Sequence, residues 1–400
     1  MHPLPTVILK RSAAQRVVKG HPWVFKGMVD KIPDGLLDGE LVQVRDSKRR
    51  PLGVGFWNGQ SKLAVRIISK SKCHINIQFF QKRIREALRQ RLMNYQKGQS
   101  FRLIHAEADG LSGLIVDIYG DIAVVQITSL GIHLNKELIV KALVIECGLS
   151  AVVERADMQS RKSEGMDSEG GVLYGDPPDD ILFKLNHLDW KINWKEGHKT
   201  GCYLDQQNNY KKIASICNGQ RVLDAFTFQG GFANHALFEG ARHVVALDQS
   251  AQALELASDI HDMNNLPDRV TWKEANVFDW LKDQTASQDV SEDNKFDVII
   301  LDPPSFAKNR GALNQAFRGY KELHLRALKL LAPDGQLVTF SCSHHVTSEM
   351  YEDVIMDAAF DCRKTLKRVE TYTQSPDHPI VPIIPETEYL KGFAYRAVSF

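Results

Sequence analysis

The chain has 400 residues, of which 43% are hydrophobic and 25% are charged, and its formal net charge is +1; this length is typical of two or three domains. Residues 1–5 do not begin the apolar run of a signal peptide, and no stretch approaches the ~18 apolar residues of a membrane helix. Because its six cysteines form no CxxC pair, which argues against a zinc ribbon or a disulfide framework, we expect a cytoplasmic protein without membrane contact or bound metal.

Charge is unevenly distributed along the chain. Residues 1–100 hold 20 Lys and Arg against 6 Asp and Glu, whereas the rest of the chain holds 30 against 43. A basic first quarter on an acidic body is expected of a protein that binds a polyanion through that quarter. The same residues could equally form a solvated charged surface, and charge alone does not separate the two interpretations.

The first part of the chain, residues 1–72, is predicted to form a small β-barrel. Its apolar stretches are short, alternate with polar residues and are separated by Gly, Asp and Asn. The expected strands include residues 7–9, 40–45, 52–57 and 63–68. A polar turn between two of them contains Lys48, Arg49 and Arg50.

A basic linker helix is expected within residues 73–100. Apolar residues recur every fourth position from Phe80 to Leu92, which predicts an amphipathic helix over 79–95 with arginines on its sides.

A central α+β domain is predicted for residues 101–195. Strand patterns are followed by a helical pattern at 134–147, a further strand, and a closing hairpin near 182–194. The polar, Gly-rich stretch 157–180 is interpreted as a long loop.

Strands alternate with helices in the remaining part, residues 196–400. This alternation predicts a doubly wound, mostly parallel sheet, so the fold class is α/β. The expected strands are 221–225, 243–247, 270–273, 297–301 and 336–341. The expected helices are 232–240, 251–263, 313–331 and 348–359.

A glycine-containing loop follows the first strand of this sheet. The strand ends near Asp224, and Gly230 and Gly231 then lead into a helix. Glycines allow a ligand to approach the backbone closely, where a side chain would collide. The loop is not GxGxxG, which argues against a phosphate site, and a glycine pair by itself is usually only a turn.

Polar residues also follow the other strands. Asp248 ends the second strand, where a carboxylate can accept both ribose hydroxyls of a nucleoside. Asn276 follows the third strand, with Val277 placed to lie against an adenine face, and Asp302 ends the fourth. A helix cap is the alternative role for Asp248, because Ser250 and a helix follow. Together these strand ends predict one ligand site at the carboxyl edge of the sheet.

The strand-end residues resemble the motifs of the class I S-adenosylmethionine-dependent methyltransferases. Residues 224–231 are similar to the first motif, Asp248 to the second, Asn276 to the third and 302–304 to the fourth. Two departures are the shifted glycines and the Asn where Asp is more usual.

The resemblance extends over nearly the whole chain. Residues 20–25, GHPWVF, resemble the start of an RNA-binding PUA domain, residues 197–206 resemble the "KTG..LDQ" segment of bacterial rRNA methyltransferases, and residues 388–393 resemble their C-terminal strand. In this order, the segments resemble those of the ribosomal RNA large subunit methyltransferase I family. The resemblance implies that the partner is 23S rRNA or a large-subunit assembly intermediate, and it leaves a homodimer open. The implied cofactor residues are Lys199, Asp224, Phe226, Gly230, Gly231, Asp248, Asn276, Val277, Asp302 and Pro303.

The family resemblance implies that a cysteine attacks the target base. C5 of cytosine is a poor nucleophile and becomes reactive once a thiolate adds to C6. Cys342 lies at the carboxyl end of the fifth strand, where RNA cytosine-C5 methyltransferases have their sixth motif. Asp302 is the candidate for holding N3 and the exocyclic amine. A buried structural cysteine is the alternative role for Cys342.

Two other functions are consistent with the sequence. An exocyclic-amine methyltransferase typically has Asp-Pro-Pro followed by an aromatic residue, but here Phe306 is displaced by one position and Cys342 would have no role. A non-catalytic RNA-binding assembly factor would use the barrel and the basic helix, with the α/β domain as a scaffold.

Overall fold

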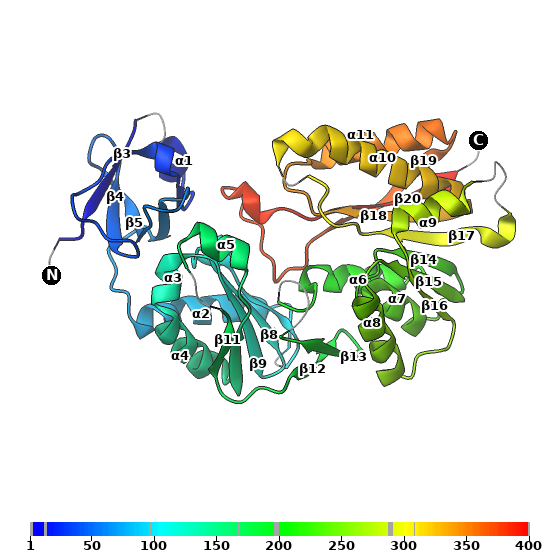
Figure 1. Ribbon diagram of the computed structural model, residues 1–400, viewed down its shortest axis with the longest axis horizontal. Coiled ribbons are helices and arrows are strands. Elements are labelled where there is room, and N and C mark those ends of the chain that lie inside the picture. The colour runs from blue at the N-terminus through cyan, green and yellow to red at the C-terminus, as the bar shows by residue number, and fades with distance from the viewer. Residues whose placement is uncertain are drawn as a thin grey trace. The chain divides into compact units, whose positions relative to one another are not determined.

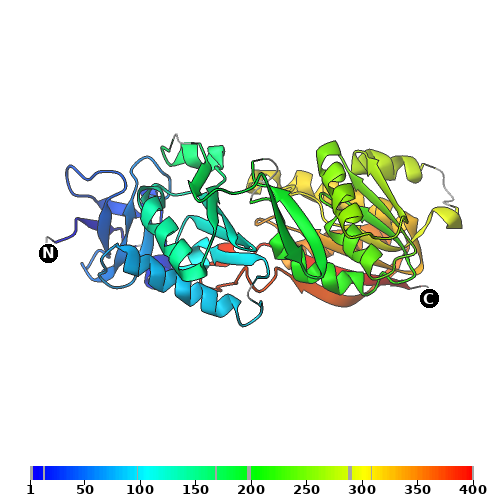
Figure 2. The same ribbon diagram turned by 90° about the horizontal axis from the view of Figure 1, so that it is seen from below.

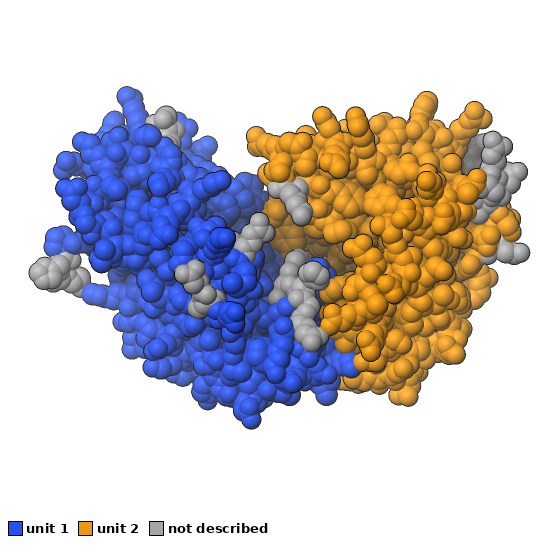
Figure 3. Space-filling model, in the orientation of Figure 1, with its two compact units in different colours: residues 1–185, 190–204, 376–387 blue, residues 186–189, 205–375, 388–400 orange. Residues whose placement is uncertain are grey.

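The computed structural model describes residues 3–11, 14–96, 98–166, 169–195, 200–286, 291–307 and 309–398. The chain forms two compact units, coloured separately in Figure 3. Unit 1 comprises residues 1–185, 190–204 and 376–387, and unit 2 comprises residues 186–189, 205–375 and 388–400. The boundaries of the two units differ from those of the four predicted segments, 1–72, 73–100, 101–195 and 196–400. The division into four segments stays a prediction.

The N-terminal part of unit 1 is a six-stranded sheet with the order β2-β6-β5-β4-β1-β3. Its alternating pattern buries one face, as Val7 and Leu9 of the first strand show. Helix α1 (Ala14–Val18) follows the first strand. The strands are β1 (Thr6–Leu9), β2 (Trp23–Val24), β3 (Val29–Lys31), β4 (Leu41–Arg45), β5 (Pro51–Trp57) and β6 (Val65–Ser69).

The predicted amphipathic helix is present as α2 (Ile77–Arg91), and the Asn76 side chain caps it by accepting a hydrogen bond from Phe79 N. It packs against α4 and β7 (Figure 2), because Phe80 and Ile84 are fully buried in that core. The adjoining sheet has the order β11-β10-β9-β8-β7. Its elements are β7 (Phe101–His105), β8 (Leu114–Tyr119), β9 (Ile122–Ile127), α3 (Leu130–Leu134), α4 (Lys136–Cys147), β10 (Ala151–Glu154) and β11 (Gly171–Tyr174).

The stretch 157–180 is more ordered than the predicted long loop. It contains α5 (Met158–Ser163) and strand β11, which pairs antiparallel with β10. An ion pair between the buried residues Arg161 and Glu154 connects α5 to β10. The closing hairpin is present as β12 (Asp180–Leu185) and β13 (Leu188–Asn193).

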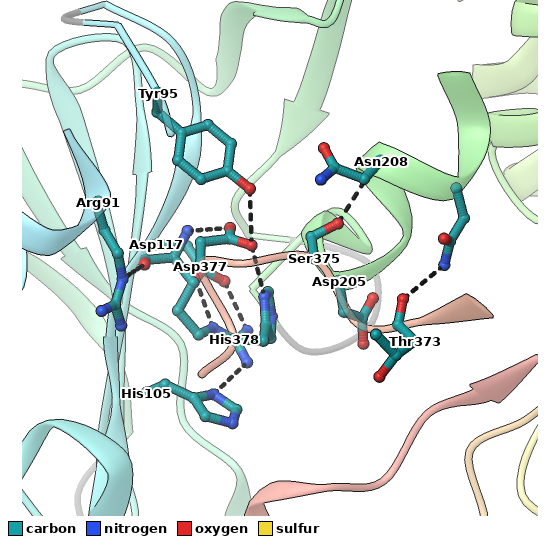
Figure 4. A network of polar contacts seen from close by, with 12 residues as sticks. Arg91, Tyr95, His105, Asp117, Asp205, Asn208, Thr373, Ser375, Asp377 and His378 are labelled. Carbon is teal, nitrogen blue, oxygen red and sulfur yellow. Dashed lines mark hydrogen bonds and ion pairs between the residues drawn. The ribbon is translucent and has the colours of Figure 1, made fainter. Parts of the chain in front are cut away.

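A segment far along the chain, residues 376–387, belongs to unit 1. Figure 4 shows Asp377 accepting hydrogen bonds from Tyr95 Oη (3.1 Å) and from the backbone N of Arg102 (2.7 Å). Glu386 forms an ion pair with Arg16 and a contact of 3.0 Å with His21. Unit 1 is therefore assembled from both ends of the chain.

Unit 2 is a seven-stranded sheet with the order β16-β15-β14-β17-β18-β20-β19. The first five strands in this order are parallel, β20 is antiparallel to β18, and β19 is antiparallel to β20. The strands are β14 (Arg221–Ala225), β15 (His243–Asp248), β16 (Val270–Glu274), β17 (Phe296–Leu301), β18 (Leu331–Ser341), β19 (Thr365–Thr373) and β20 (Lys391–Val398).

Helices cover both faces of this sheet, as Figure 1 shows. The first group lies on one face and comprises α6 (Gln207–Ala214), α7 (Gly231–Phe238) and α8 (Ala251–Met263). The second group comprises α9 (Val277–Gln284), α10 (Leu313–Leu330) and α11 (Ser348–Asp361). The predicted α/β fold class is thus confirmed. Within the described ranges, no helix combines the length and apolar character needed to cross a membrane.

Two elements of unit 2 differ from the sequence prediction. Helix α9, which was not among the expected helices, begins at Val277, and the Asn276 side chain caps it. Strand β18 begins at Leu331, directly after α10, because it pairs along β17 from Phe296 onward with a bulge.

Candidate cofactor and catalytic site

The carboxyl ends of β14, β15, β16, β17 and β18 lie at one edge of the unit 2 sheet, because these strands are parallel. All predicted site residues but one follow these ends. Lys199 is outside the described residues, so its predicted contact with the cofactor stays a prediction.

Asp224 is a fully buried carboxylate near the end of β14. Its Oδ2 accepts hydrogen bonds from Thr227 Oγ1 (2.5 Å) and from Ala233 N (3.0 Å), while its Oδ1 is buried without a partner among the described residues. Burial raises the pKa of Asp224 to about 7, against the opposing effect of these hydrogen bonds. One buried carboxylate oxygen thus has no donor among the described residues.

The loop after Asp224 has an unusual backbone. Phe226 (φ 67°), Phe228 (φ 51°) and Gly230 (φ 74°) all have left-handed conformations, which are costly for residues with a side chain. Gly231 is required by packing, since a Cβ there would lie 2.5 Å from the Tyr210 ring. The glycine pair therefore shapes the loop and lets α7 approach α6.

Asp248 holds this loop in place. Its Oδ2 accepts a hydrogen bond from Phe228 N (2.9 Å), and its Oδ1 accepts one from Ser250 N (2.9 Å). The cap of α8 is Ser250, whose hydroxyl accepts from Ala253 N. Asp248 is half-buried. The helix-cap role that was the alternative for Asp248 belongs to Ser250.

Asn276 and Val277 both have structural contacts. The Asn276 side chain accepts hydrogen bonds from Phe278 N (2.9 Å) and Asp279 N (3.3 Å) and is exposed. Val277 is buried and packs in the apolar core of the sheet. A helix cap explains Asn276 without a ligand, and its predicted contact with adenine stays a prediction.

Asp302 follows β17 and is held by a residue that the sequence analysis did not assign to the site. Gln206 Nε2 donates a hydrogen bond of 2.9 Å to Asp302 Oδ2. Gln206 is itself buried and accepts from Asn209 Nδ2 (2.7 Å). The carboxylate of Asp302 is therefore oriented by the segment that precedes α6. The sequence signal that could have identified Gln206 was its place in the "LDQ" part of the family segment.

Cys342 follows β18 at the same sheet edge. Its Sγ lies 4.0 Å from the backbone O of Pro303, so the structure brings the ends of β17 and β18 together. Cys342 is half-buried, whereas Ser341 and Ser343 on either side of it are fully buried. The backbone around the thiol is thus fixed while the thiol itself keeps some exposure.

A cluster of hydroxyl groups anchors the two neighbours of Cys342. Tyr320 Oη is 3.0 Å from both Ser341 Oγ and Ser343 Oγ. Ser343 Oγ is also 3.0 Å from Ser305 Oγ, in the loop that follows β17. These contacts connect α10, β17 and β18 at the carboxyl edge of the sheet.

Lys391 is a second residue that the sequence analysis did not assign to the site. It begins β20, pairs with Ser341 of β18, and donates a hydrogen bond from Nζ to Ser343 O (2.8 Å). The residue is 8% exposed. Burial lowers the pKa of Lys391, while the nearby Cys342 and Glu388 act in the opposite direction. Lys391 belongs to the segment 388–393 that resembles the family's C-terminal strand, but only the strand pairing shows that it lies next to Ser341.

The residues fit S-adenosylmethionine, the cofactor that the family resemblance implies, which is a nucleoside carrying an amino-acid group. The buried, unpartnered Oδ1 of Asp224 can accept a hydrogen bond from an ammonium group. The left-handed loop 226–230 presents backbone at the sheet edge, and Asp248 ends the neighbouring strand.

Comparisons with known proteins agree with this architecture. Residues 7–70 match the model of a PUA-like domain, and residues 127–393 match the model of an S-adenosylmethionine-dependent methyltransferase. A relative from Tolumonas auensis, named ribosomal RNA large subunit methyltransferase I, is 36% identical over 98% of this chain and 99% of its own length. A similar relative of that name, from Aeromonas salmonicida, is 34% identical with the same coverage.

The fold is also similar to a solved structure. A protein described as a methyltransferase and complexed with SAH has a TM-score of 0.83 at 20% identity, covering 98% of this chain and 99% of its own. At this identity the likeness concerns the fold.

The sheet order, the residues at its carboxyl edge and the two matching models define a class I S-adenosylmethionine-dependent methyltransferase joined to a PUA-like domain. S-adenosylmethionine is therefore its cofactor. The chain belongs to the ribosomal RNA large subunit methyltransferase I family.

Proposed function

We propose that this enzyme methylates C5 of a cytosine in 23S rRNA through a covalent adduct between Cys342 and C6. The observation that carries the proposal is the place of Cys342, whose thiol lies 4.0 Å from Pro303 O at the edge where the cofactor motifs end. The name shared by its relatives supports a large-subunit rRNA substrate. A large-subunit assembly intermediate would present the same base.

The proposed chemistry needs a nucleophile and a group that holds the base. The Cys342 thiolate adds to C6, and the electron pair moves to C5, which becomes nucleophilic. S-adenosylmethionine supplies the electrophilic methyl group. Methyl transfer would leave S-adenosylhomocysteine. A base then takes the C5 proton, the electrons of the C5–H bond restore the C5–C6 double bond, and the C6–S bond breaks to regenerate the Cys342 thiolate. Asp302, whose side chain Gln206 orients, is proposed to hold the base by accepting a hydrogen bond from the exocyclic amine and by sharing a proton with N3.

The cofactor is proposed to contact the residues at the ends of β14 to β17. Asp224 offers its unpartnered oxygen, and the left-handed loop of Phe226, Gly230 and Gly231 offers backbone. Asp248 is proposed to accept hydrogen bonds from the ribose. The remaining proposed contacts are those of Asn276, Val277, Asp302 and Pro303 at the following strand ends, together with Lys199.

The basic N-terminal part is proposed to hold the RNA. Residues 7–70 match a PUA-like domain, and the first 100 residues carry the excess of basic side chains. A cytoplasmic location stays a prediction. Neither the comparisons nor the described part of the chain supports the homodimer considered from the sequence, which is left out of the proposal.

The adduct can be trapped with RNA that contains 5-fluorocytosine at the target. The fluorine at C5 cannot leave as a proton does, so the protein–RNA bond should persist and appear as a slow band on a denaturing gel. Cys342→Ala should form no such band and should lose methylation, yet bind S-adenosylmethionine with native affinity in calorimetry.

A matched control is Cys362→Ala, which replaces a cysteine of α11's C-cap and should trap the RNA as the native enzyme does. Methylation by Cys342→Ala at a near-native rate would overturn the C5 assignment. The methylated nucleoside should then be identified by mass spectrometry, with an exocyclic-amine product as the expected replacement. Absence of any transfer by the native enzyme, despite cofactor and RNA binding, would point to a non-catalytic assembly factor.

A further inference from the structure

We infer that the ammonium group of Lys391 stabilises the thiolate form of Cys342 and is thereby a positioning residue of the reaction. This inference rests on the proposed function, in which that thiolate is the nucleophile. It adds a residue from the antiparallel strand β20 to a site otherwise built at the ends of parallel strands.

The strand pairing places Lys391 beside the cysteine. β20 is antiparallel to β18, so its first residue, Lys391, pairs with Ser341, the last residue of β18. Cys342 is the next residue along the chain. The hydrogen bond from Lys391 Nζ to Ser343 O (2.8 Å) holds the ammonium against the backbone on the far side of the cysteine. Lys391 therefore lies along residues 341–343, because its backbone pairs with Ser341 and its ammonium group contacts Ser343 O.

Burial makes this charge effective. Lys391 is 8% exposed, and a buried charge is screened by water and salt much less than an exposed one. A neighbouring cation is among the environments that lower the pKa of a cysteine thiol. The interaction is mutual, because the charge of Cys342 acts to raise the pKa of Lys391 against the lowering effect of burial.

The other ionisable groups described around Cys342 are a tyrosine, two carboxylates and two histidines. Tyr320 contacts both neighbouring serines from α10, and burial raises its pKa, so it stays neutral. Asp302 follows β17 and would oppose a thiolate if ionised, and Glu388 precedes β20 and acts to raise the pKa of Lys391. The histidines His344 and His345 follow the cysteine in the same loop, and His344 packs near Tyr389 with ring centroids 5.7 Å apart. Among the described residues, Lys391 is a buried lysine that contacts the backbone on both sides of Cys342.

Alkylation of Cys342 by iodoacetamide measures the thiolate directly, without RNA or cofactor. The rate should be followed from about pH 6 to about pH 10 by mass spectrometry of the peptide that contains Cys342. In Lys391→Met the apparent pKa of the thiol should rise, and alkylation near neutral pH should slow by about tenfold, since each pKa unit changes the thiolate fraction tenfold. Lys211→Met, which removes an exposed lysine of α6, should behave as the native protein.

Two further variants separate charge from hydrogen bonding. Lys391→Arg keeps the cation and should keep the native alkylation profile, whereas Lys391→Gln keeps a donor but no charge and should resemble Lys391→Met. Thermal unfolding and S-adenosylmethionine affinity show that each variant is folded. If Lys391→Gln retains the native pH profile, or if a folded Lys391→Met does, the inference is overturned.

The outcome can be read apart from the proposed function. A native enzyme that traps 5-fluorocytosine RNA, combined with an unchanged alkylation profile in folded Lys391→Met, would remove the role of Lys391 and leave the C5 mechanism standing. A shifted profile combined with full methylation by Cys342→Ala would confirm the coupling of Lys391 to Cys342 and remove the nucleophilic role.

Discussion

Gln206 Nε2 donates a hydrogen bond of 2.9 Å to Asp302 Oδ2, although the two residues are 96 positions apart. The amide is buried and is held in turn by Asn209. A donor fixed in this way sets the orientation of the carboxylate before any base arrives, which reduces the ordering that the reaction must supply. The segment before α6 is thus connected to the proposed base-holding residue.

Gln206→Leu should slow methylation with little effect on cofactor binding. A hydrogen bond to a charged group contributes about 1.5–3 kcal/mol, so kcat/KM should fall by about ten- to a hundredfold. Single-turnover kinetics with calorimetry of S-adenosylmethionine would check this. Gln206→Glu should be slower still, because it places a second carboxylate against Asp302. A native rate in Gln206→Leu would mean that Asp302 does not act through this contact.

Asp248→Ala should weaken S-adenosylmethionine binding by about 1.5–3 kcal/mol if the ribose hydroxyls donate to this carboxylate. The substitution also removes the acceptor for Phe228 N, which shapes the first loop. Asp248→Asn keeps one acceptor oxygen for that N–H and removes the charge, so it should lose less affinity. Calorimetry on both variants distinguishes the two effects, and unchanged affinity in Asp248→Ala would place the ribose elsewhere.

Asp224 should make stability depend on pH. Its pKa is about 7 in the folded protein, against about 3.9 in an unfolded chain. Between these values the folded state holds a proton that the unfolded state has released, so the free energy of unfolding falls as pH rises from about 4 to about 7, and it levels off above that. Roughly three pKa units set a ceiling of about 4 kcal/mol on this loss.

Asp224→Asn tests this titration, because the amide keeps an acceptor for Thr227 and Ala233 but cannot ionise. Melting temperatures of the cofactor-free protein at about pH 5 and about pH 8 should differ less in the variant than in the native protein. An equal difference in both would show that other groups cause the dependence. Asp297→Asn serves as the control, since it changes a half-buried carboxylate at the start of β17.

The turn between β4 and β5 should contribute to RNA binding. Asp46 organises it by accepting hydrogen bonds from Lys48 N and Arg50 N, and the Arg50 side chain is 69% exposed. Replacing Lys48, Arg49 and Arg50 by Ala should weaken binding and flatten its salt dependence, because fewer counterions are released from phosphates. Binding isotherms at several salt concentrations, with Lys211→Ala and Lys212→Ala as a control, would check this. An unchanged slope would exclude the turn from the RNA contact.

The alternation of strands and helices in unit 2 was readable from the sequence because it is a local pattern. Strand β14 begins and ends where predicted, at Arg221 and Ala225, and α8 spans the predicted 251–263. The predictions were less accurate where a partner decides the structure. Strand β11 depends on pairing with β10.

The candidate site divides in the same way. Asp224, Asp248, Asp302 and Cys342 could be selected from the sequence, because each follows an apolar strand and parallel strands end at one edge. Their chemical partners could not be selected, since Gln206 and Lys391 reach them from distant parts of the chain.

The sequence by itself determined the fold class, the order of the motifs and the residues that end the strands, because these depend on periodicity over a few neighbouring positions. Only the tertiary structure decided that residues 376–387 join unit 1 and that Lys391 lies beside residues 341–343. The place of Lys391 follows from β20, which inserts between β18 and β19 in the sheet. Strand order is a property of long-range packing, and no local pattern of side chains encodes which strands become neighbours.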